Sequence, residues 1–429
     1  MLKTPKLRFK DKNGNAYPEW SSKQFDEVFE ILQNNTFSRK ELNYSNKSVK
    51  NIHYGDILIN YPVNLNCQTC EIPNINQDIN LSKYKSSSYL QNGDVIFADT
   101  AEDETVGKVC ELYNVQEKML SGLHTIPCRP KFNFASKYLG YFLNSNLYHN
   151  QLLPLITGIK VSSVSKSSIK TTEIYYPCLE EQEKIAGFLS KVDELINECE
   201  GEVKDLEEQK KGLMQKIFSQ QIRFKDSNNN PYPDWEEHCI NEFIISLKSG
   251  LSRELQNEDI GIPVIRANNT YNGIVGGNDI KYWYKKDPKG ANIDNYILDD
   301  GDILINFINS LPRMGETAIY TNFLNRPCIY TTNLLRLKLN NKLNYKYFFY
   351  YTKTSEYINY IKAITKPAVN QASFTTVDFK NLKLLLPCLE EQEKIAKVLS
   401  KMNELIEEKK ALLSDWQQFK KGLLQQMFV

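Results

Sequence analysis

The chain has 429 residues, of which 41% are hydrophobic and 24% charged, and its formal net charge is +1. This is the composition of a globular protein, and the length exceeds what one hydrophobic core usually serves, so we expect two or more domains. We expect neither a signal peptide nor a membrane span, because Met1–Lys12 is polar and no run of about 18 apolar residues occurs.

Nine cysteines, an odd number, are scattered along the chain. Without a signal peptide, this pattern predicts reduced thiols in a cytosol rather than a disulfide framework. Cys67 and Cys70 form one CxxC pair, but a closed zinc site would need two further ligands at a suitable spacing. We therefore predict a surface loop at this pair and no metal site.

Two motifs occur twice and divide the chain into similar halves. Residues 7–20 read LRFKDKNGNAYPEW and residues 222–235 read IRFKDSNNNPYPDW, while CLEEQEKIA occurs at residues 178–186 and 388–396. Between these motifs the halves differ at most positions. Two unlike recognition surfaces on equal supports explain the contrast better than a purely structural duplication, which is the alternative.

The repeat predicts the domain boundaries. We divide the chain into a leading segment (1–20), a first globular domain (21–178), a central helix (179–221), a second leading segment with its globular domain (222–387) and a C-terminal helix (388–429).

The globular segments carry signals for both strands and helices. Strands are predicted at Asp94–Ala98 and Asp302–Asn306, each after a Gly-Asp turn, and at Asp56–Asn60. Helices are predicted at Lys137–Asn144 and Tyr345–Tyr351. Gly107 and Gly315 each follow the glycine of the Gly-Asp turn by fourteen residues. Each segment is therefore expected to mix α and β structure.

Each globular segment also contains a long stretch that is poor in acidic residues. Lys118–Thr172 has no Asp or Glu, and Thr317–Val377 has one, Glu356. Basic, amide-rich surface without carboxylates favours phosphate contact, and Asn, Gln and Arg can read base edges. We therefore predict DNA contact, with chance clustering on a solvated face as the alternative. The candidate DNA-binding residues are Lys131, Lys137, Lys160, Lys166, Lys170, Arg266, Asn268, Asn269, Arg313, Lys366, Asn370 and Gln371.

Apolar residues recur in heptads after each CLEEQEKIA motif, which predicts two coiled-coil helices of roughly 60 Å each. The predicted helix-pair core consists of Ile185, Val192, Leu206, Leu213, Ile395, Met402, Trp416 and Leu423. The residues predicted to join the stripe of the second helix are Val398, Leu399, Leu405, Ile406, Leu412, Leu413 and Phe419, and Lys409 interrupts it. One copy packed antiparallel against the other would bury both stripes. The charged faces, which include Glu180 and Glu181, are interpreted mainly as solvated, although exposed sides of the pair could dock partner subunits.

No catalytic arrangement is evident in the sequence. There is no Gly-rich loop ending in Gly-Lys-Ser/Thr, and without a Pro-Pro dipeptide the amino-methyltransferase motif is missing. We predict a binding subunit rather than an enzyme. The alternatives are a complete DNA-modifying enzyme, which an assay with S-adenosylmethionine would reveal, and a coiled-coil scaffold without a nucleic-acid role.

The duplicated ProCysLeuGluGluGlnGluLysIleAla motif, the Arg-Phe-Lys-Asp…Tyr-Pro…Trp segments and the Gly-Asp-Ile-Leu strand together resemble the specificity subunits of type I restriction-modification enzymes. The resemblance covers essentially the whole chain. It implies an α+β fold: two mixed α/β target recognition domains separated by two long helices packed as an antiparallel coiled coil, with a pseudo-two-fold internal repeat.

The same resemblance implies how such a chain works. Each globular domain would read one half of a split, asymmetric site in double-stranded DNA, and the helices would space the two domains. Two adenine-methyltransferase subunits and the translocase-nuclease (restriction) subunits would be its partners in a bacterial cytoplasm. S-adenosylmethionine, ATP and Mg would belong to those partners, and no cofactor to this chain. The family motifs carry no catalytic residue onto this sequence and identify no base-reading residue.

Overall fold

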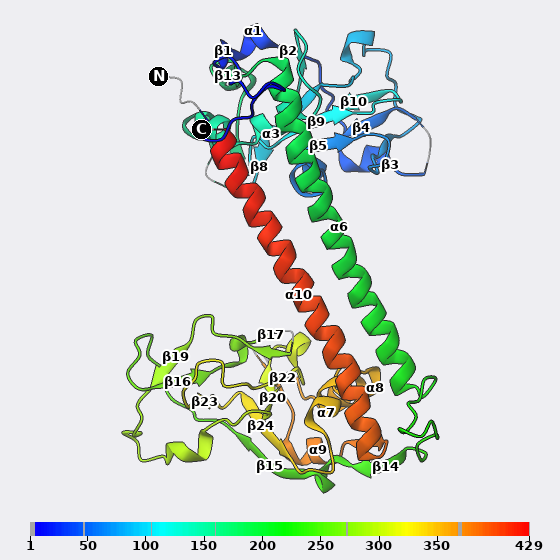
Figure 1. Cartoon of the computed structure of the whole chain (residues 1–429), viewed down its shortest axis with the longest axis vertical. Coiled ribbons are helices and arrows are strands. Elements are labelled where there is room, and N and C mark those ends of the chain that lie inside the picture. The colour runs from blue at the N-terminus through cyan, green and yellow to red at the C-terminus, as the bar shows by residue number, and fades with distance from the viewer. Residues whose placement is uncertain are drawn as a thin grey trace. The chain divides into compact units, whose positions relative to one another are not determined.

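A computed structural model describes residues 5–45, 48–103, 105–158, 160–271, 273–367 and 371–428 (Figure 1). It forms two compact units. The first unit comprises Met1–Glu200 and Ala411–Val429, and the second comprises Gly201–Lys410. Each unit therefore contains one mixed domain and a part of both long helices, α6 (Leu179–Phe218) and α10 (Leu389–Met427). No helix among the described residues is both long and apolar enough to cross a bilayer.

The first unit is built on a five-stranded sheet in the order β2-β11-β7-β9-β5, with a separate four-stranded sheet in the order β10-β4-β6-β3. Its remaining strands form two-stranded pairs, β1 with β13 and β8 with β12. The elements are β1 (Ser21–Gln24), α1 (Phe25–Val28), β2 (Phe29–Ile31), β3 (Leu42–Asn43), β4 (Lys50–Ile52), α2 (Tyr54–Ile59), β5 (Asn64–Asn66), β6 (Asn74–Ile75), β7 (Val95–Ala98), β8 (Thr100–Ala101), β9 (Val109–Tyr113), β10 (Met119–Ser121), β11 (Thr125–Pro130), α3 (Tyr138–Leu143), α4 (Asn146–Leu152), β12 (Ser162–Ser163), α5 (Lys166–Ile169) and β13 (Glu173–Tyr176).

The second unit repeats this plan with a six-stranded sheet in the order β15-β24-β20-β22-β18-β17 and a three-stranded sheet in the order β19-β16-β23. Two-stranded pairs are formed by β14 with β26 and by β21 with β25. The elements are β14 (Glu236–Cys239), β15 (Ile244–Ser249), β16 (Ile262–Ile265), β17 (Thr270–Tyr271), β18 (Ile274–Val275), β19 (Lys281–Trp283), β20 (Ile303–Asn306), β21 (Ile308–Asn309), β22 (Thr317–Ile319), β23 (Ile329–Tyr330), β24 (Leu334–Leu339), α7 (Tyr345–Tyr351), α8 (Ser355–Ile364), β25 (Ala372–Ser373), α9 (Thr376–Lys380) and β26 (Lys383–Leu386).

The predicted internal repeat is confirmed by the strand pairing. In the first unit β7 pairs antiparallel with β9 and β11, and in the second unit β20 pairs antiparallel with β22 and β24. The strands predicted at Asp94–Ala98 and Asp302–Asn306 are β7 and β20, and the predicted helices are α3 and α7. The fold class is therefore α+β, as the sequence predicts.

The strand predicted at Asp56–Asn60 is wrong, because this segment belongs to helix α2. Two side chains explain the helix. The imidazole of His53, at the N-cap, accepts a hydrogen bond from Gly55 N at 3.2 Å. The Asp56 carboxylate is buried and holds both terminal nitrogens of Arg39 at 2.8 Å. These contacts fix the first turn, and the local sequence does not reveal them.

The two long helices pack antiparallel, as predicted (Figure 1). In the first unit, the start of α6 (Ile185, Val192) shares a core with the end of α10 (Leu423). In the second unit, the end of α6 (Ile217) shares a core with the start of α10 (Ile395). The pairing of start with end in both units requires opposite helix directions.

The predicted helix-pair core needs one correction. Leu405, Leu412 and Phe419 are 41%, 41% and 48% exposed, whereas the other stripe residues Ile406, Leu413 and Trp416 are buried or half-buried, because α10 turns only one side toward the protein. Of the eight predicted core residues, four are buried and four are half-buried. The buried ones are Ile185, Val192, Ile395 and Leu423, and the half-buried ones are Leu206, Leu213, Met402 and Trp416. Lys409, at the interrupted position, donates to Glu202 at 2.6 Å.

The two repeated motifs contact each other in both units. Arg8 of the leading segment donates to Glu181 of α6 through two bonds of 3.1 and 2.8 Å. Arg223 donates to Glu391 of α10 through two bonds of 2.9 Å. Both glutamates are fully buried, so the prediction that Glu181 is solvated is wrong. A bidentate guanidinium–carboxylate pair fixes direction as well as distance, so each leading segment is clamped to the helix that ends its own half.

The glutamines that follow these glutamates have matching roles. Gln182 accepts from Ala135 N at 3.0 Å and donates to Pro177 O at 2.9 Å. Gln392 accepts from Asn344 N at 2.9 Å and donates to Pro387 O at 3.0 Å. The repeated LEEQEK sequence therefore joins each helix start to the adjacent domain, which explains why both copies keep the same residues.

Gly107 and Gly315 occupy equivalent tight sites. Their φ angles are +85° and +74°, and an added Cβ would lie 2.8 Å from Leu152 Cδ1 or 2.6 Å from Ile361 Cγ2. Replacing either glycine by alanine is expected to lower the free energy of unfolding by about 1–3 kcal/mol, because the new side chain is strained in both backbone and packing. Denaturant unfolding would measure this.

Gly187, in helix α6, is the matched control. An added Cβ there meets no atom within 4 Å, so Gly187→Ala should be neutral or stabilise by about 0.5–1 kcal/mol. Equal stabilities of Gly315→Ala and Gly187→Ala would contradict the assignment of a tight site.

Candidate nucleic-acid interface

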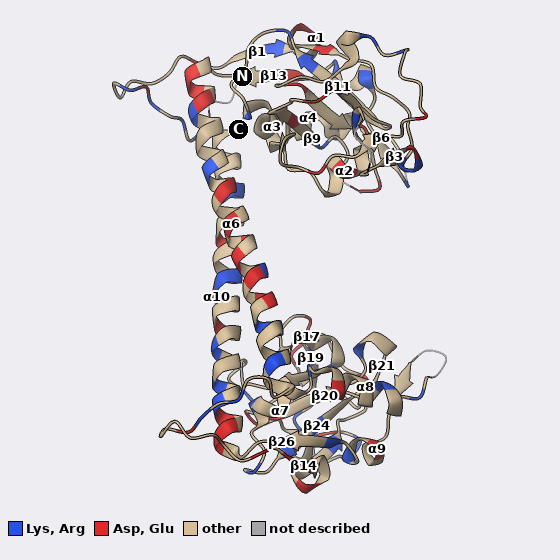
Figure 2. Cartoon of the chain, turned by 90° about the vertical axis from the view of Figure 1, so that its right-hand side faces the viewer, with Lys and Arg blue, Asp and Glu red and all other residues tan. Residues whose placement is uncertain are grey.

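Each unit carries a two-stranded ribbon beside its main sheet. In the first unit, β8 pairs with β12, with Thr100 opposite Ser163; in the second, β21 pairs with β25, with Ile308 opposite Ser373. Figure 2 shows the ribbon of the second unit, labelled β21, at the rim of that unit. A two-stranded ribbon has the width to enter the major groove of DNA.

A hairpin leads into the second strand of each ribbon. In the first unit, Thr157 and Ser163 exchange backbone hydrogen bonds of 3.0 and 2.7 Å. In the second, Lys366 and Ser373 exchange bonds of 2.8 and 3.1 Å. The two ribbons are therefore built alike, although the hairpin of the second unit is one residue longer.

In the first unit, a tight turn brings an imidazole against the ribbon. His124 Nδ1 lies 3.3 Å from Thr100 Oγ1 and 3.4 Å from Asp99 Oδ1, and Thr100 Oγ1 donates to Asp99 Oδ1 at 2.7 Å. The ring also packs edge-on against Tyr54, with ring centroids 5.2 Å apart. Since Nδ1 is engaged, Nε2 is the nitrogen left for an external partner. We name Thr100 and His124 the first corner.

A cavity of about 300 Å³ adjoins the first corner. Besides the corner residues, its polar lining includes the hydroxyl-bearing residues Thr157, Ser163, Ser165 and Ser168. The His124 side chain is 46% exposed. The first corner therefore offers hydroxyl and imidazole groups at an accessible surface.

The equivalent positions of the second unit carry different side chains. Thr125 pairs with Ala98 and Leu334 pairs with Asn306, so His124 and Asn333, which directly precede Thr125 and Leu334, correspond. Thr100 and Ile308 correspond as well, because each stands two residues after Ala98 or Asn306. Asn333 Nδ2 donates to Ile308 O at 3.3 Å. We name Ile308 and Asn333 the second corner, which combines an aliphatic side chain with an amide.

Some predicted DNA-binding residues of the first unit gather near the first corner. Lys160 lies on the exposed hairpin, and Lys170 is the exposed C-cap of α5. Lys166 Nζ donates to Asn34 Oδ1 at 3.3 Å, and Asn34 Nδ2 donates to Gly122 O, in the turn that carries His124, at 3.4 Å. These contacts place Lys166 beside the turn that carries His124, while Lys160 lies on the hairpin that leads into β12.

Two predicted residues of the first unit lie elsewhere. Lys131 Nζ donates to Asp26 O at 2.5 Å, near α1. The Lys137 ammonium lies 4.6 Å from the centroid of the Tyr113 ring, and its backbone caps α3. The structure therefore does not bring these lysines together with the ribbon.

In the second unit, Lys366 and Gln371 are exposed on the hairpin, whereas Asn370 lies outside the described residues. Arg313 braces the loop after β21. Its guanidinium donates to Glu316 at 2.8 Å and to Thr270 O at 2.5 Å.

The polar side chains of the segment that begins at Arg266 are mostly engaged in contacts within the same domain. Arg266 pairs with Asp279 at 2.7 Å, while Asn268 is exposed. Asn269 is buried, accepts from Arg266 N at 2.9 Å and donates to Asn278 O at 2.6 Å. Asn269 therefore shapes the loop rather than facing a groove, so we leave it out of the interface.

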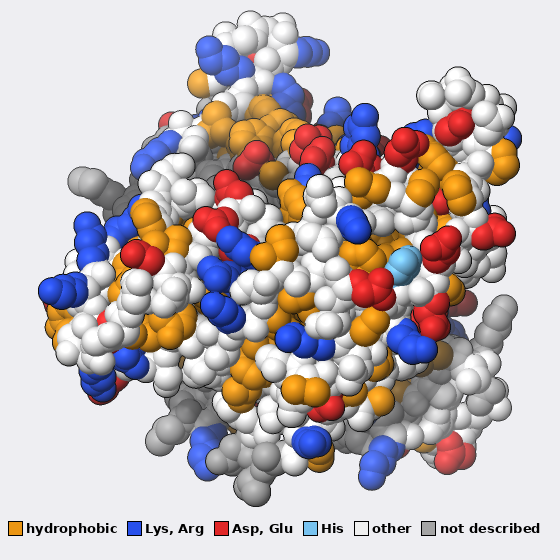
Figure 3. All heavy atoms as spheres, turned by 90° about the horizontal axis from the view of Figure 1, so that it is seen from below, with side chains coloured by type: hydrophobic (Ala, Val, Ile, Leu, Met, Phe, Trp, Pro, Cys, Tyr) orange, Lys and Arg blue, Asp and Glu red, His pale blue; other side chains and the backbone are white. Residues whose placement is uncertain are grey.

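Some basic residues of the acid-poor stretches form ion pairs in the folded protein with acidic residues from elsewhere in the chain. Arg129 pairs with Asp94 at 2.7 Å, and Arg326 pairs with Asp259 at 2.5 Å. Both acids lie outside the acid-poor stretches, so these cations are neutralised by partners that are distant in sequence. The face of the molecule in Figure 3 accordingly shows basic and acidic side chains interspersed.

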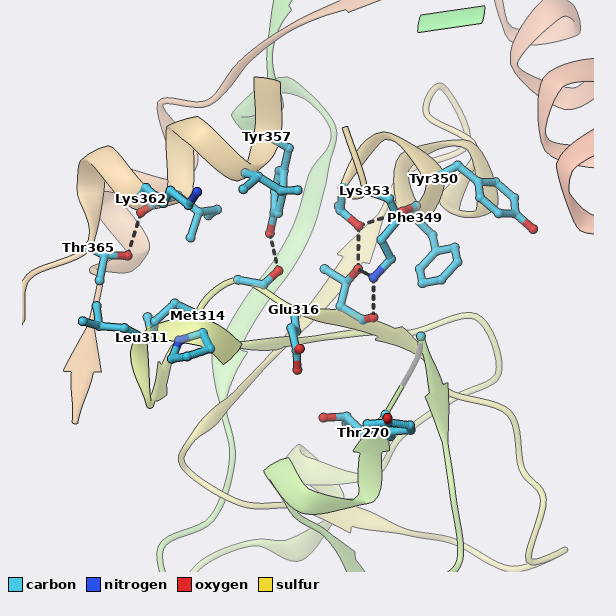
Figure 4. A pocket seen from close by; sticks show the side chains of 18 of the residues that line it. Thr270, Leu311, Met314, Glu316, Phe349, Tyr350, Lys353, Tyr357, Lys362 and Thr365 are labelled. Carbon is cyan, nitrogen blue, oxygen red and sulfur yellow. Dashed lines mark hydrogen bonds between the residues drawn. The ribbon is translucent and has the colours of Figure 1, made fainter. Parts of the chain in front are cut away.

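A cavity of about 840 Å³ in the second unit is lined in part by residues of α6 and α8 (Figure 4). Lys353 Nζ donates to Thr317 O and Oγ1, both at 3.1 Å. At the equivalent place in the first unit, Asn144 bonds Val109 N at 3.0 Å and Val109 O at 2.8 Å. Lys353 therefore fastens a helix end to the sheet.

The cysteine pair does not lie on the predicted surface loop. Cys67 is buried in a turn rather than on a surface loop, and burial raises its pKa to about 12. Cys70 is half-buried, and the structure describes no group of three or more His, Cys, Asp or Glu residues placed to hold a metal ion.

Neither corner, Thr100 with His124 or Ile308 with Asn333, is predicted from the sequence. The residues of each corner are separated by 24 or 25 positions, and no motif joins them. The available signal was indirect. His124 and Asn333 lie inside the acid-poor stretches, and Thr100 and Ile308 each stand six residues after the Asp of the aligned Gly-Asp turns.

Comparison with known proteins agrees with this architecture. A family profile described as "Type I restriction modification DNA specificity domain" matches residues 17–208 and again 232–414. The chain belongs to this family, the specificity subunits of type I restriction-modification systems, which recognise DNA sequence.

Individual relatives span most of the chain. A Methanocaldococcus jannaschii protein assigned as the MjaX specificity subunit of a type I restriction enzyme is 26% identical, covering 96% of this chain and 93% of the relative. The EcoKI specificity subunit of Escherichia coli K12 is 22% identical over 73% of this chain and 68% of its own length. The crystal structure of a type I S subunit from M. genitalium has the same fold, with a TM-score of 0.58 and 14% identity, covering 100% of this chain and 99% of that chain.

Proposed function

We propose that this chain directs type I adenine methylation and restriction to a bipartite, asymmetric site in double-stranded DNA, with each domain reading one half-site. One observation carries the proposal. The two units share one framework, yet the corners of their ribbons present different chemistry at matching positions. Equal supports with unlike contact groups are what two unlike half-sites require.

In this proposal, the chemistry belongs to partner subunits. Two methyltransferase subunits would bind S-adenosylmethionine, and restriction subunits would use ATP and Mg. Base flipping of the target adenine would fall to the methyltransferase, while this chain holds the duplex without a catalytic role of its own. The site of action would be the bacterial cytoplasm. The names of its relatives as specificity subunits support this division.

DNA binding can be tested with the chain purified together with its methyltransferase partner. Fluorescence anisotropy on a labelled duplex should show affinity that falls steeply with salt, because bound lysines release condensed counterions. Six phosphate contacts would cost about 10³-fold between 50 and 200 mM salt. Absent or salt-insensitive binding would contradict the proposal. Methyl transfer by the purified chain alone would instead favour a complete enzyme.

The helices are proposed to set the spacing of the half-sites. Inserting four residues in phase in both α6 and α10 would lengthen each helix by about 6 Å, which corresponds to roughly two base pairs of DNA. The expected result is a methylated motif with unchanged half-sites and a gap longer by about two base pairs, measured by sequencing methylated sites. An unchanged gap would exclude this spacing role.

A further inference from the structure

The two corners occupy equivalent positions in the two units, so their residues can be compared directly. Strand pairing fixes the correspondence of Thr100 with Ile308 and of His124 with Asn333. Since side chains alternate along a strand, matching register also places the side chains of Thr100 and Ile308 on the same face of their ribbons. The comparison is therefore position by position.

The first corner is held in an unusual conformation. His124 has φ +52°, in the left-handed region that non-glycine residues seldom adopt. Contacts with Tyr54, Asp99 and Thr100 keep the ring in one place. Strained residues that are braced on several sides concentrate at functional sites. Asn333 is absent from the described residues with positive φ, so the fold itself does not demand this conformation.

The charges around the ribbon restrict where DNA could lie. Glu102 and Asp103, which are exposed, follow β8 and would repel phosphates. Because Ser162 pairs with Ala101, the hairpin with Lys160 lies at the same end of the ribbon as these two acids, whereas Lys166 on α5 follows β12 at the opposite end. A duplex that engages Lys166 would therefore lie on the α5 side of the ribbon, away from Glu102 and Asp103, and meet Thr100 and His124.

We propose that the two corners are specificity positions for the two half-sites. In the first corner, the Thr100 hydroxyl and His124 Nε2 would hydrogen-bond a base edge in the major groove. In the second corner, Ile308 would contact a thymine methyl group and Asn333 would hydrogen-bond an adjacent base. Apolar side chains and amides are the groups that suit thymine and adenine in that groove. This inference rests on the proposed function and assigns the reading of bases to these four residues.

Exchange of the corners tests the proposal in the assembled enzyme. Thr100→Ile with His124→Asn gives the first unit the second corner, and Ile308→Thr with Asn333→His does the reverse. Each double variant is expressed with its partner subunits in a host, and methylated adenines are mapped by sequencing. Each exchange should change the base preference about 10-fold or more at one or two positions of a single half-site. The other half-site and the gap should stay as in the wild type.

Asp193→Asn is the matched control. It also makes the first unit resemble the second, since Asn403 occupies the equivalent position in α10. However, Asp193 lies on α6, where it accepts from Tyr141 Oη at 2.7 Å, so this change should leave both half-sites unaltered. His124→Gln serves as a second variant in case the double variant fails to fold; it replaces the imidazole by an amide, so the base preference of the first half-site should change.

The possible results distinguish failure of the corner assignment from failure of the proposed function. If His124→Gln and the folded double variants keep the wild-type motif, the corners do not read bases and the inference is overturned. A change in both half-sites from one exchange would overturn it as well. If the wild-type complex methylates no bipartite site, the proposed function fails instead.

Discussion

Replacing Glu391 by alanine is expected to lower the free energy of unfolding by about 3 kcal/mol, the largest loss that we expect from a single side chain in this protein. Glu391 is fully buried and holds Arg223 through two bonds of 2.9 Å, and it also accepts from Trp235 Nε1 at 3.2 Å. Removing one partner of a buried ion pair leaves the other uncompensated, which typically costs about 3–5 kcal/mol. The Arg223 side chain is 24% exposed, so the lower end applies.

Glu390→Ala is the control, because this neighbouring glutamate is exposed. Denaturant unfolding followed by tryptophan fluorescence should show the loss for Glu391→Ala and little change for Glu390→Ala. Glu181→Ala, in the first unit, should cost about 1 kcal/mol less than Glu391→Ala. The reason is that Trp20 Nε1, unlike Trp235 Nε1, has no hydrogen-bond partner among the described residues. Equal stability of Glu390→Ala and Glu391→Ala would contradict the clamp between leading segment and helix.

The second large effect concerns pH and Glu111 on β9. This carboxyl group is 1% exposed and accepts from Lys137 N at 2.5 Å and Gly140 N at 2.8 Å, at the start of α3. Burial raises the pKa of Glu111 to about 7, although the N–H groups favour the charged form. The folded protein therefore disfavours ionisation that the unfolded chain, with an ordinary pKa of 4.5, allows freely.

The sign of the pH effect follows from that difference. The protonated form is favoured by folding, so stability is fully present below pH 4.5, declines as the pH rises and levels off above pH 7. Each unit of difference between the folded and unfolded pKa of Glu111 corresponds to about 1.4 kcal/mol. The free energy of unfolding should therefore fall by about 3 kcal/mol across this pH range. Unfolding free energies of the wild type and Glu111→Gln between pH 5 and 8 would measure it. The difference between the two proteins should vary by a few kcal/mol across this window, and a constant difference would refute the titration.

The parts of the fold that could be predicted from the sequence are those marked by the repeated motifs. The copied motifs located both helices and their antiparallel pairing, because a long apolar stripe must be buried and its copy is the nearest complement. Local patterns were less reliable. The hexapeptide GDILIN occurs at residues 55–60 and 301–306, and it forms part of helix α2 in the first case and of strand β20 in the second. His53 and Arg39 stabilise the helix, whereas Gly301, with φ +87°, turns into the strand.

The candidate interface was only partly predictable for a related reason. Charge counts along the chain identified the hairpin lysines Lys160 and Lys366, which are exposed. The same counts included Arg129, whose partner Asp94 lies on another strand. The contact of His124 with Thr100 likewise joins separate strands. Pairing between distant segments decides which charges remain available for a ligand, and a single sequence without a fold does not supply those pairs.

The central claim is that two alike domains read two unlike half-sites. It is tested most directly by mapping methylated adenines genome-wide in a host that carries this chain with its methyltransferase partner. The account predicts one bipartite motif with two different halves separated by a gap of fixed length. A continuous motif, or one whose halves are identical, would contradict it.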